Sequence, residues 1–363
     1  MTGNEPANHG RRGDASAPCP CALPQLIDPA RYKPCDWDLL ADAAGRAHWL
    51  DLFNAHFAAI KRAALVSGYR ERDIDAAWIE INAMIERLRD DPRAAGDELN
   101  ILTLDRIRDG ALRRHGVADP FAAVKRAANE SALAQLADRL GAIDRTREDD
   151  RLAELARGVF AGNLFDMGAP QTAARFHDNA GIRFAELLGD VKARPWLYDG
   201  IERAGLIGKR KAVIFVDNAG GDVVLGVLPL ARALLQNGAK VILAASQEPV
   251  LNDVTAEELT ELRARAGTID SIFADEKLRV LSTGTDTPLI DLTTLAPALC
   301  EAAIDADLLV LVGMGRALES NWLASFSCES WRVATIKETG IARRRGGVIY
   351  DCVFRVEGAG RRA

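Results

Sequence analysis

The sequence predicts an α/β fold, in which a helical N-terminal unit packs on a three-layer α/β/α domain with a mostly parallel sheet. Three observations predict this fold. Apolar residues recur at three- and four-residue spacing from about residue 36 to residue 186, as they do in amphipathic helices. After Arg194-Pro195, short β-branched runs alternate with helical segments, which is typical of parallel strands joined by helices. The length of 363 residues is sufficient for both units.

Three segments are expected along the chain. Residues 1–24 mix Gly, Pro, Asn and Arg without periodicity and are predicted to be a flexible tail. Residues 25–200 are predicted to form the helical unit, with about five to seven helices separated by Gly- and Pro-rich breaks. Residues 201–363 are predicted to form the α/β domain.

The α/β domain should contain six strands, each a short run rich in Val, Ile and Leu. These runs are residues 212–216, 240–244, 278–281, 308–312, 333–336 and 348–354. A helix over 222–236 should stop at Asn237-Gly238 and bend at Pro229, which lacks an N–H donor. Thr255 and Glu258 form a capping-box pattern at the start of a second helix.

Composition excludes several classes of function. The net charge of -6 argues against a nucleic-acid groove or a polybasic membrane patch, and leaves a small-molecule ligand. No run of 18 apolar residues occurs and no signal peptide opens the chain, so a cytoplasmic protein is expected. The oligomeric state is not indicated.

The cysteines and histidines narrow the chemistry. The six cysteines are scattered, which predicts free thiols rather than a disulfide framework. His9 with Cys19, Cys21 and Cys35 could be a metal cluster, but the spacing is unlike that of structural zinc sites. The last histidine is His177, so the α/β domain has no histidine base. Histidine-phosphatase chemistry and a Ser-His-Asp triad within that domain are therefore excluded.

The first predicted strand ends in a polar turn. Asp217 and Asn218 follow it directly, and Gly220 comes just before a helix. Backbone N–H groups in such a turn favour an anion such as phosphate. The alternative is an ordinary tight turn with Asx hydrogen bonds.

The second predicted strand leads to Asn252 and Asp253, again just before a helix. Sequential strands are usually neighbours, so Asp253 should lie beside Asp217 and Asn218. Carboxylate and amide oxygens of this kind suit Mg²⁺ or Mn²⁺. Asp253 could instead serve as a helix cap.

Two further strand ends supply positively charged side chains. Gly313-Met314-Gly315-Arg316 follows the strand at 308–312, where glycines permit close backbone approach and Arg316 can bind phosphate bidentately. Lys337 follows the strand at 333–336 and would neutralise a phosphoryl oxygen, although a strand-terminal lysine is more often solvated. Together, the four strand ends indicate phosphoryl transfer to water.

Four segments carry a resemblance to a known family: VDNAGGDVVLGVLPLARALL, VILAASQEPVLNDVT, LVGMGRALESN and VATIK. They resemble the damage-control phosphatases, a former domain of unknown function, and most of all the phosphatase domain fused to some pantothenate kinases. Matching segments such as ILTLDRIRD at 101–109 extend the resemblance over about residues 35–357.

The resemblance implies a phosphatase that uses a divalent metal, either Mn²⁺, Mg²⁺, Ni²⁺ or Co²⁺. It implies that Asp217, Asn218 and Asp253 hold the metal and that Asp217, Asp253 and Lys337 are catalytic. The implied phosphate- or substrate-binding residues are Gly220, Gly313, Met314, Gly315, Arg316, Asn321, Lys337, Asn163 and Asp166.

The implied substrate is a phosphomonoester, namely 4′-phosphopantetheine or its oxidised or otherwise damaged forms, in metabolite damage control of the coenzyme A pathway. One departure concerns this substrate, because Val312 stands where the branch usually has Glu. Attack by metal-bound water and by Asp217 as a covalent nucleophile both stay open.

Two other functions are considered. A phosphopantetheine-sensing module without turnover would bind the same ligand. A Rossmann-like methyltransferase that uses S-adenosylmethionine would need an acidic residue after the second strand, where this chain has Ala244-Ala245-Ser246.

Overall fold

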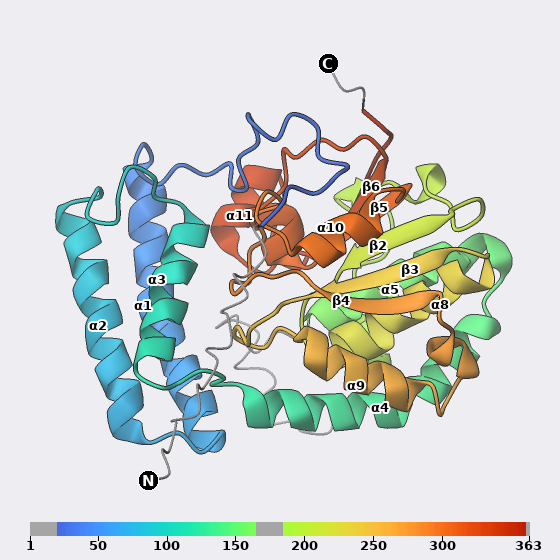
Figure 1. Cartoon of the computed structure of the whole chain (residues 1–363), viewed down its shortest axis with the longest axis horizontal. Helices are drawn as coiled ribbons and strands as arrows, with labels where there is room; N and C mark the ends of the chain where they lie inside the picture. The colour runs from blue at the N-terminus through green and yellow to red at the C-terminus, as the bar shows by residue number, and fades with distance from the viewer. Residues whose placement is uncertain (1–19, 165–183, 361–363) are drawn as a thin grey trace, which may run out of the picture.

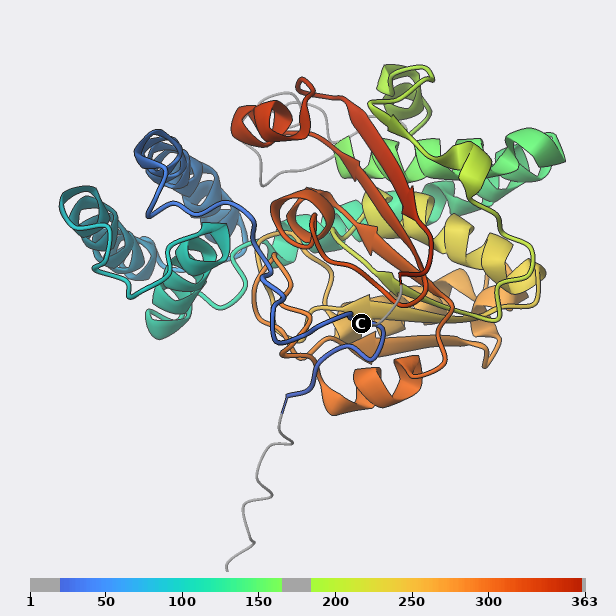
Figure 2. The same ribbon diagram turned by 90° about the horizontal axis from the view of Figure 1, so that it is seen from above.

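The computed structural model describes residues 20–164 and 184–360. Helices cover both faces of a single seven-stranded sheet, and the first three helices form a bundle beside it (Figure 1). Figure 2 shows the same bundle from above, set against the end of the sheet at which the site described below lies. N-terminal helices followed by a three-layer α/β domain are therefore confirmed.

The helices of the first part of the chain follow the predicted apolar periodicity. They are α1 (Ala43–Val66), α2 (Glu71–Asp90), α3 (Ile101–Arg114), α4 (Ala122–Asp144), α5 (Glu148–Leu164) and α7 (Phe184–Asp190). The N-cap side chains of Asp42 and Asn100 accept hydrogen bonds from backbone N–H groups at the starts of α1 and α3.

The strands are short, and the inner ones are almost wholly buried, as expected of a parallel sheet covered on both faces, whereas the edge strands are partly exposed. They are β1 (Tyr198–Asp199), β2 (Lys211–Phe215), β3 (Lys240–Ala245), β4 (Leu278–Ser282), β5 (Leu308–Val312), β6 (Glu329–Thr335) and β7 (Cys352–Glu357). Their order is β1-β7-β6-β5-β2-β3-β4, and every neighbouring pair is parallel except β6 and β7. All six predicted strands are present, although the last begins at Cys352 rather than at 348. The two-residue β1 gave no sequence signal.

The helices of the α/β part connect these strands. They are η1 (Ile201–Arg203), η2 (Asp222–Val227), α8 (Leu228–Gln236), α9 (Ala256–Ala266), η3 (Ser271–Ala274), α10 (Pro297–Ala303), η4 (Gly315–Glu319) and α11 (Thr339–Arg345). The helix predicted over 222–236 is divided into a π-helical turn, η2, and an α-helix, α8. Pro229 is the second residue of α8, at the point where the π-helical turn continues into the α-helix. The capping box of Thr255 and Glu258 is confirmed.

Alternate strand residues face two different layers. In β2, Val213 and Phe215 belong to a buried cluster that also contains residues of α1, α3 and α10, whereas Ala212 and Ile214 belong to a second cluster with residues of α4, α5 and α8. The period of two along each strand therefore determines which helices cover which face. Helices α4 and α5 belong to the layered domain, although they come from the first part of the sequence.

The segment before α1 differs from the predicted tail. Residues 20–24 lie against the α/β domain: Cys21 N donates to Leu295 O at 2.9 Å, and Leu23 is 1% exposed. Burial of Leu23 and Leu26 fixes this segment. A stretch this short has no periodicity to reveal such burial.

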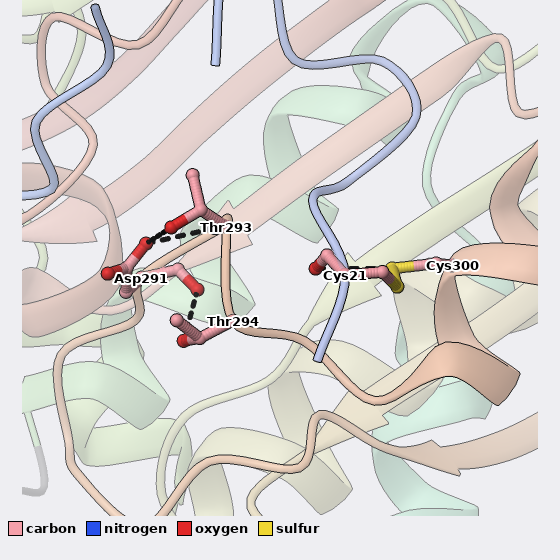
Figure 3. The surroundings of a disulfide bond; sticks show 5 residues. All are labelled: Cys21, Asp291, Thr293, Thr294 and Cys300. Atoms are coloured by element: carbon pink, nitrogen blue, oxygen red, sulfur yellow. Dashed lines mark hydrogen bonds between the residues drawn. A yellow bond between two sulfur atoms is a disulfide. The ribbon is translucent and has the colours of Figure 1, made fainter. Parts of the chain in front are cut away.

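The prediction that all cysteines are free thiols is wrong for one pair. Cys21 and Cys300 form a disulfide across 279 residues of sequence (Figure 3). The paired backbones of Cys21 and Leu295 bring the two thiols together, a proximity that cysteine spacing could not reveal. Cys35, Cys328 and Cys352 are buried free thiols, as predicted.

None of the helices in the described part of the chain has the length and apolar character needed to span a bilayer.

Candidate functional site

The site lies where four neighbouring strands end. In the order β6-β5-β2-β3, the segments after these strands bring Lys337, Gly313, Asp217 and Asp253 to one edge of the sheet. Backbone contacts fix this convergence: Asn218 and Asp253 form an isolated antiparallel bridge, and Val254 N donates to Asp217 O at 3.0 Å. The predicted meeting of Asp217, Asn218 and Asp253 is therefore present in the structure.

Arg316 lies between the two carboxylates. Its Nη2 donates to Asp253 Oδ2 at 2.7 Å and to Ser246 Oγ at 3.2 Å, while Nη1 donates to Asp217 Oδ1. The side chain is buried. In this arrangement Arg316 neutralises acidic groups, whereas the sequence predicted a direct phosphate contact.

Asn163 reaches the same carboxylate from α5. Its Nδ2 donates to Asp217 Oδ2 at 2.9 Å and to Asp222 Oδ2 at 3.1 Å, and its Oδ1 accepts from Thr335 N at 3.2 Å. Asn218 Nδ2 makes the same pair of contacts, at 3.0 and 3.1 Å. The fold therefore uses Asn163 to orient Asp217, whereas Asp166, predicted beside it, lies outside the described residues.

Asp222 completes the buried cluster. Burial and the neighbouring Asp217 carboxylate raise the pKa of Asp222 to about 7. Its Oδ1 is buried and has no hydrogen-bond partner among the residues that the structure describes. Sequence reasoning missed Asp222, which looked like an ordinary first residue of a helix.

Two glycines explain how the backbone fits. Gly313 has a φ of +92°, and a Cβ at this position would overlap the Asp217 carboxylate. Gly220 has a φ of +78°, and its N–H donates to Asn129 Oδ1 of α4 at 2.6 Å. The N–H of Gly220, predicted to bind phosphate, is thus engaged by the protein itself.

A pocket of about 120 Å³ opens beside this cluster. One side is formed by the strand ends, and the other by α1 and α3. Its lining includes six of the predicted site residues: Asp217, Asn218, Asp253, Met314, Gly315 and Lys337.

The other predicted residues that the structure describes are not part of the lining. Within the described ranges the lining does not include Asn163, Gly220, Gly313, Arg316 or Asn321. Asn321 has a φ of +60° and accepts from Tyr32 Oη at 2.6 Å, and its Nδ2 donates to backbone carbonyls, so its contacts stabilise the loop after β5.

Lys337 is 1% exposed and nevertheless lines the pocket. Its backbone N–H points at Met314 Sδ, 3.2 Å away, which joins the loop after β5 to the end of β6. Val312, the departure from the family pattern, packs on the opposite face of β5 in the layer of α4 and α5. A Glu side chain at position 312 would therefore leave the strand on the side of α4 and α5 and not on the side of the pocket wall.

The wall from the helical bundle was not predicted. It consists of Trp49, Leu52, Phe53 and His56 of α1 together with Ile101, Asp105 and Arg108 of α3. Glu319 and Glu338 also line the pocket. The segment ILTLDRIRD, which contains Asp105 and Arg108, matched the family, but helical periodicity alone does not show what a helix faces.

Two acidic side chains that line the pocket, Asp105 and Glu319, have raised pKa values. Burial raises the pKa of Asp105 to about 7, although Arg108 opposes the shift. Burial, with the nearby Asp105 carboxylate adding to it, raises the pKa of Glu319 well above its usual range. The Glu338 carboxylate caps α11, accepting from the N–H groups of Gly340 and Ile341 at 2.7 Å.

The chemistry of the strand-end donors fits a hard divalent cation. In the described part of the chain, no three His, Cys, Asp or Glu side chains form a recognisable metal site. A cation would therefore use a mixed set of oxygens, the carboxylates of Asp217 and Asp253 and the amide of Asn218, which suits Mg²⁺ or Mn²⁺. Asp222 Oδ1 is a further buried oxygen in the same cluster.

Comparisons with known proteins identify the family to which this chain is similar. A family model described as the damage-control phosphatase ARMT1-like domain matches residues 55–353. The damage-control phosphatase At2g17340 of Arabidopsis thaliana is 39% identical over 281 residues, covering 75% of this chain and 76% of that protein.

Two further similarities concern a mouse enzyme and an archaeal structure. The 4′-phosphopantetheine phosphatase of Mus musculus is 29% identical over 92% of this chain, which spans 48% of that protein. A crystal structure of a DUF89 family protein from Pyrococcus horikoshii aligns with a TM-score of 0.60 at 18% identity. It covers 84% of this chain and 97% of that one, which shows a shared fold.

Proposed function

The chain belongs to the damage-control phosphatase ARMT1-like family, and from this premise we propose that it is a metal-dependent phosphatase acting on 4′-phosphopantetheine or its damaged forms. The observation that carries the proposal is the position of Lys337 in one pocket with Asp217, Asn218 and Asp253. A cation and an oxygen-donor set at the end of a parallel sheet are the groups that phosphoryl transfer needs.

The site residues would have different roles in this reaction. Asp217, Asn218 and Asp253 would hold the divalent cation, whose chemistry at such a site is to polarise the phosphoryl group and activate water. Lys337 would bind a phosphoryl oxygen and stabilise the charge that develops on it. Asn163 holds Asp217 in place through a 2.9 Å hydrogen bond.

Arg316 would share its carboxylate partners with the cation. Its ion pairs with Asp217 and Asp253 offset the charge of two buried carboxylates that the cation would also contact. If the bound cation displaces the Arg316 guanidinium from Asp217 and Asp253, the guanidinium becomes available to contact the phosphate. The proposal includes a contact between Arg316 and phosphate only in that case.

The substrate assignment has two supports. A relative that is 29% identical over 92% of this chain bears the name 4′-phosphopantetheine phosphatase. The pocket has an apolar side made of α1 residues such as Trp49 and Phe53, which suits the methyl groups of a pantetheine chain.

The test is phosphate release from 4′-phosphopantetheine with Mn²⁺, Mg²⁺, Ni²⁺ or Co²⁺, compared with EDTA. The wild-type protein should be active with at least one of these ions and inactive in EDTA. Asp217→Ala, Asp253→Ala and Lys337→Met should each lower kcat/KM by at least about 100-fold, as loss of a group that stabilises the transition state does.

Lys192→Met is the matched control for Lys337→Met. Lys192 pairs with Asp351 at the surface and is 43% exposed, so kcat/KM should not change. Undiminished turnover in Asp217→Ala and Asp253→Ala would refute the metal assignment. Binding of 4′-phosphopantetheine without phosphate release under any cation would favour a sensing module instead.

A further inference from the structure

We propose that Asp222 is a positioning residue for the cation site, which holds the side-chain amide of Asn218 in the orientation that presents its oxygen to a divalent cation. This inference rests on the proposed function, because Asn218 is one of the residues to which that proposal assigns the cation. Asp222 is 1% exposed and is not among the described residues that line the pocket. It therefore acts on the site through its neighbours.

The amide nitrogen of Asn218 faces two carboxylates. Its Nδ2 donates to Asp217 Oδ2 at 3.0 Å and to Asp222 Oδ2 at 3.1 Å. A primary amide has two N–H groups, so these two contacts use both of them. Because Asn218 lines the pocket, its amide oxygen is the group left for a hard cation there.

The opposite orientation of this amide is unfavourable. A rotation by 180° would exchange nitrogen and oxygen, so that the oxygen met the two carboxylates and the N–H groups met the cation. Both contacts would bring partial charges of like sign together. Each carboxylate that accepts from Nδ2 therefore favours the cation-binding orientation, and Asp222 provides one of the two.

Asp217 alone would hold this amide less firmly, because Asn163 uses the same oxygen. Asn163 Nδ2 donates to Asp217 Oδ2 at 2.9 Å and to Asp222 Oδ2 at 3.1 Å. The orientation of Asn163 is fixed from the other side, since Thr335 N–H donates to its Oδ1 at 3.2 Å. Without Asp222, the amide nitrogens of Asn163 and Asn218 would have to share Asp217 Oδ2.

The fold places Asp222 firmly behind the site. It is the first residue of η2, and its Oδ2 also accepts from Asn218 N at 3.4 Å. Helix α5 lies directly against it: a Cβ added to Gly162 would be 2.5 Å from Asp222 Cα. Asp222 Oδ1 is buried without a hydrogen-bond partner in residues 20–164 and 184–360. Such an oxygen is costly to bury, so an aspartate at this place calls for a role beyond packing.

Binding of Mn²⁺ without substrate tests this role, with free Mn²⁺ measured by electron paramagnetic resonance. Positioning requires an acceptor oxygen and not a charge. Asp222→Asn keeps an oxygen that can accept from both amides, so its Kd for Mn²⁺ should stay within about threefold of the wild-type value. Asp222→Ala and Asp222→Leu have no acceptor, and their Kd should rise by about 10- to 100-fold, as expected when a metal ligand loses its orienting partner.

Asp222→Leu retains a side chain of similar shape, so it tests the role even where the smaller Ala disturbs packing. An equal rise of the Kd in Asp222→Asn and Asp222→Leu would overturn the proposal, because the charge rather than the acceptor would then matter. An unchanged Kd in Asp222→Leu would overturn it too.

A double-mutant cycle shows whether Asp222 acts through Asn218. Asn218→Ala removes the amide, so the further change Asp222→Leu should raise the Kd for Mn²⁺ by less than about twofold in that background. Fully additive losses would mean that Asp222 acts on the cation independently of Asn218, contrary to the proposal.

Asp199→Leu is the matched control. Like Asp222, Asp199 has an Oδ2 that accepts hydrogen bonds and a buried Oδ1 without a partner in the described ranges. It lies in β1, at the edge of the sheet, and is not among the described lining residues. Its Kd for Mn²⁺ should stay within about twofold of the wild-type value. An equal rise in Asp199→Leu and Asp222→Leu would indicate a general loss of structure and would refute a positioning role.

The binding curves separate this inference from the phosphatase activity. A wild-type protein that binds no Mn²⁺ would refute the cation site and the role of Asp222 together. Wild-type binding with an unchanged Kd in Asp222→Leu would refute only the role of Asp222. The expected Kd values without phosphate release from any ester would support the role of Asp222 and refute the phosphatase.

Discussion

Arg316 Nη2 lies 2.7 Å from Asp253 Oδ2, and the two residues are only 2% and 3% exposed. The same guanidinium contacts Asp217. Buried ion pairs of this kind are costly to break, because the remaining charge stays out of water. The site thus contains an internal cation at the place where the proposal puts a metal ion.

Replacing Arg316 by a neutral residue should make the stability of the site depend more strongly on a bound metal ion. Arg316→Gln should lower the free energy of unfolding by about 3–5 kcal/mol, because the buried ion pairs of Arg316 with Asp217 and Asp253 are broken. Mn²⁺ should then raise the Tm of the variant more than that of the wild type, which thermal unfolding with and without Mn²⁺ measures.

The control for this variant is Arg194→Gln. Arg194 pairs with Asp199 and Glu202 at the surface, so its loss should cost less than about 1 kcal/mol and be insensitive to Mn²⁺. Equal Tm shifts with Mn²⁺ in Arg316→Gln and the wild type would contradict the idea that cation and guanidinium share partners.

Asn163→Ala should damage both stability and activity. The change removes one of the two amide donors to Asp217 and Asp222 and leaves Thr335 N–H without the Asn163 acceptor, which should cost about 1–3 kcal/mol. Because Asp217 also loses its orientation, kcat should fall about tenfold or more. Asn237→Ala, which removes only a contact to Ala233 O at the end of α8, should leave kcat unchanged.

Stability should depend on the ionisation of Asp105. Its pKa is raised to about 7 by burial, above that of an unfolded Asp, so the folded state binds the proton more tightly. The resulting contribution is complete below about pH 4 and is lost as pH rises through 7. The unfolding free energy of the wild type relative to Asp105→Asn should therefore fall by about 1–4 kcal/mol between pH 4 and pH 8. Urea unfolding at several pH values measures this difference, and a flat difference would contradict the shift.

The disulfide should stabilise the chain. Cys21 and Cys300 close a loop of 279 residues, so reduction should lower the unfolding free energy by about 2–5 kcal/mol. A dithiol reductant should lower the Tm of the wild type but not that of the double variant Cys21→Ser/Cys300→Ser. A wild-type Tm that ignores the reductant would show that the pair is not joined in solution.

The strand ends were predictable because two local signals coincide there. A buried β-branched run marks each strand, and the rule that parallel strands share one functional edge brings their ends together. Asp217, Asn218, Asp253 and Lys337 were located in this way. Their partners depend on side-chain directions that spacing does not carry, so Arg316 was expected to face phosphate and was found against carboxylates.

The helical wall could not be predicted for a different reason. A period of 3.6 identifies the buried face of α3, but not whether that face meets apolar core or a pocket. Asp105 and Arg108 lie on that face and look like surface charges in the sequence. The contact between Cys21 and Cys300 is equally invisible, because it arises from a backbone pairing between segments far apart in the chain.

The pocket takes one wall from α1 and α3 and the other from the strand ends. A ligand that touches both walls binds only to molecules in which the bundle is docked on the sheet. By mass action, each tenfold excess of such a ligand over its Kd stabilises the docked state of the bundle by about 1.4 kcal/mol of free energy. An occupied site therefore holds the two parts of the molecule together, and the substrate contributes to the stability of the fold.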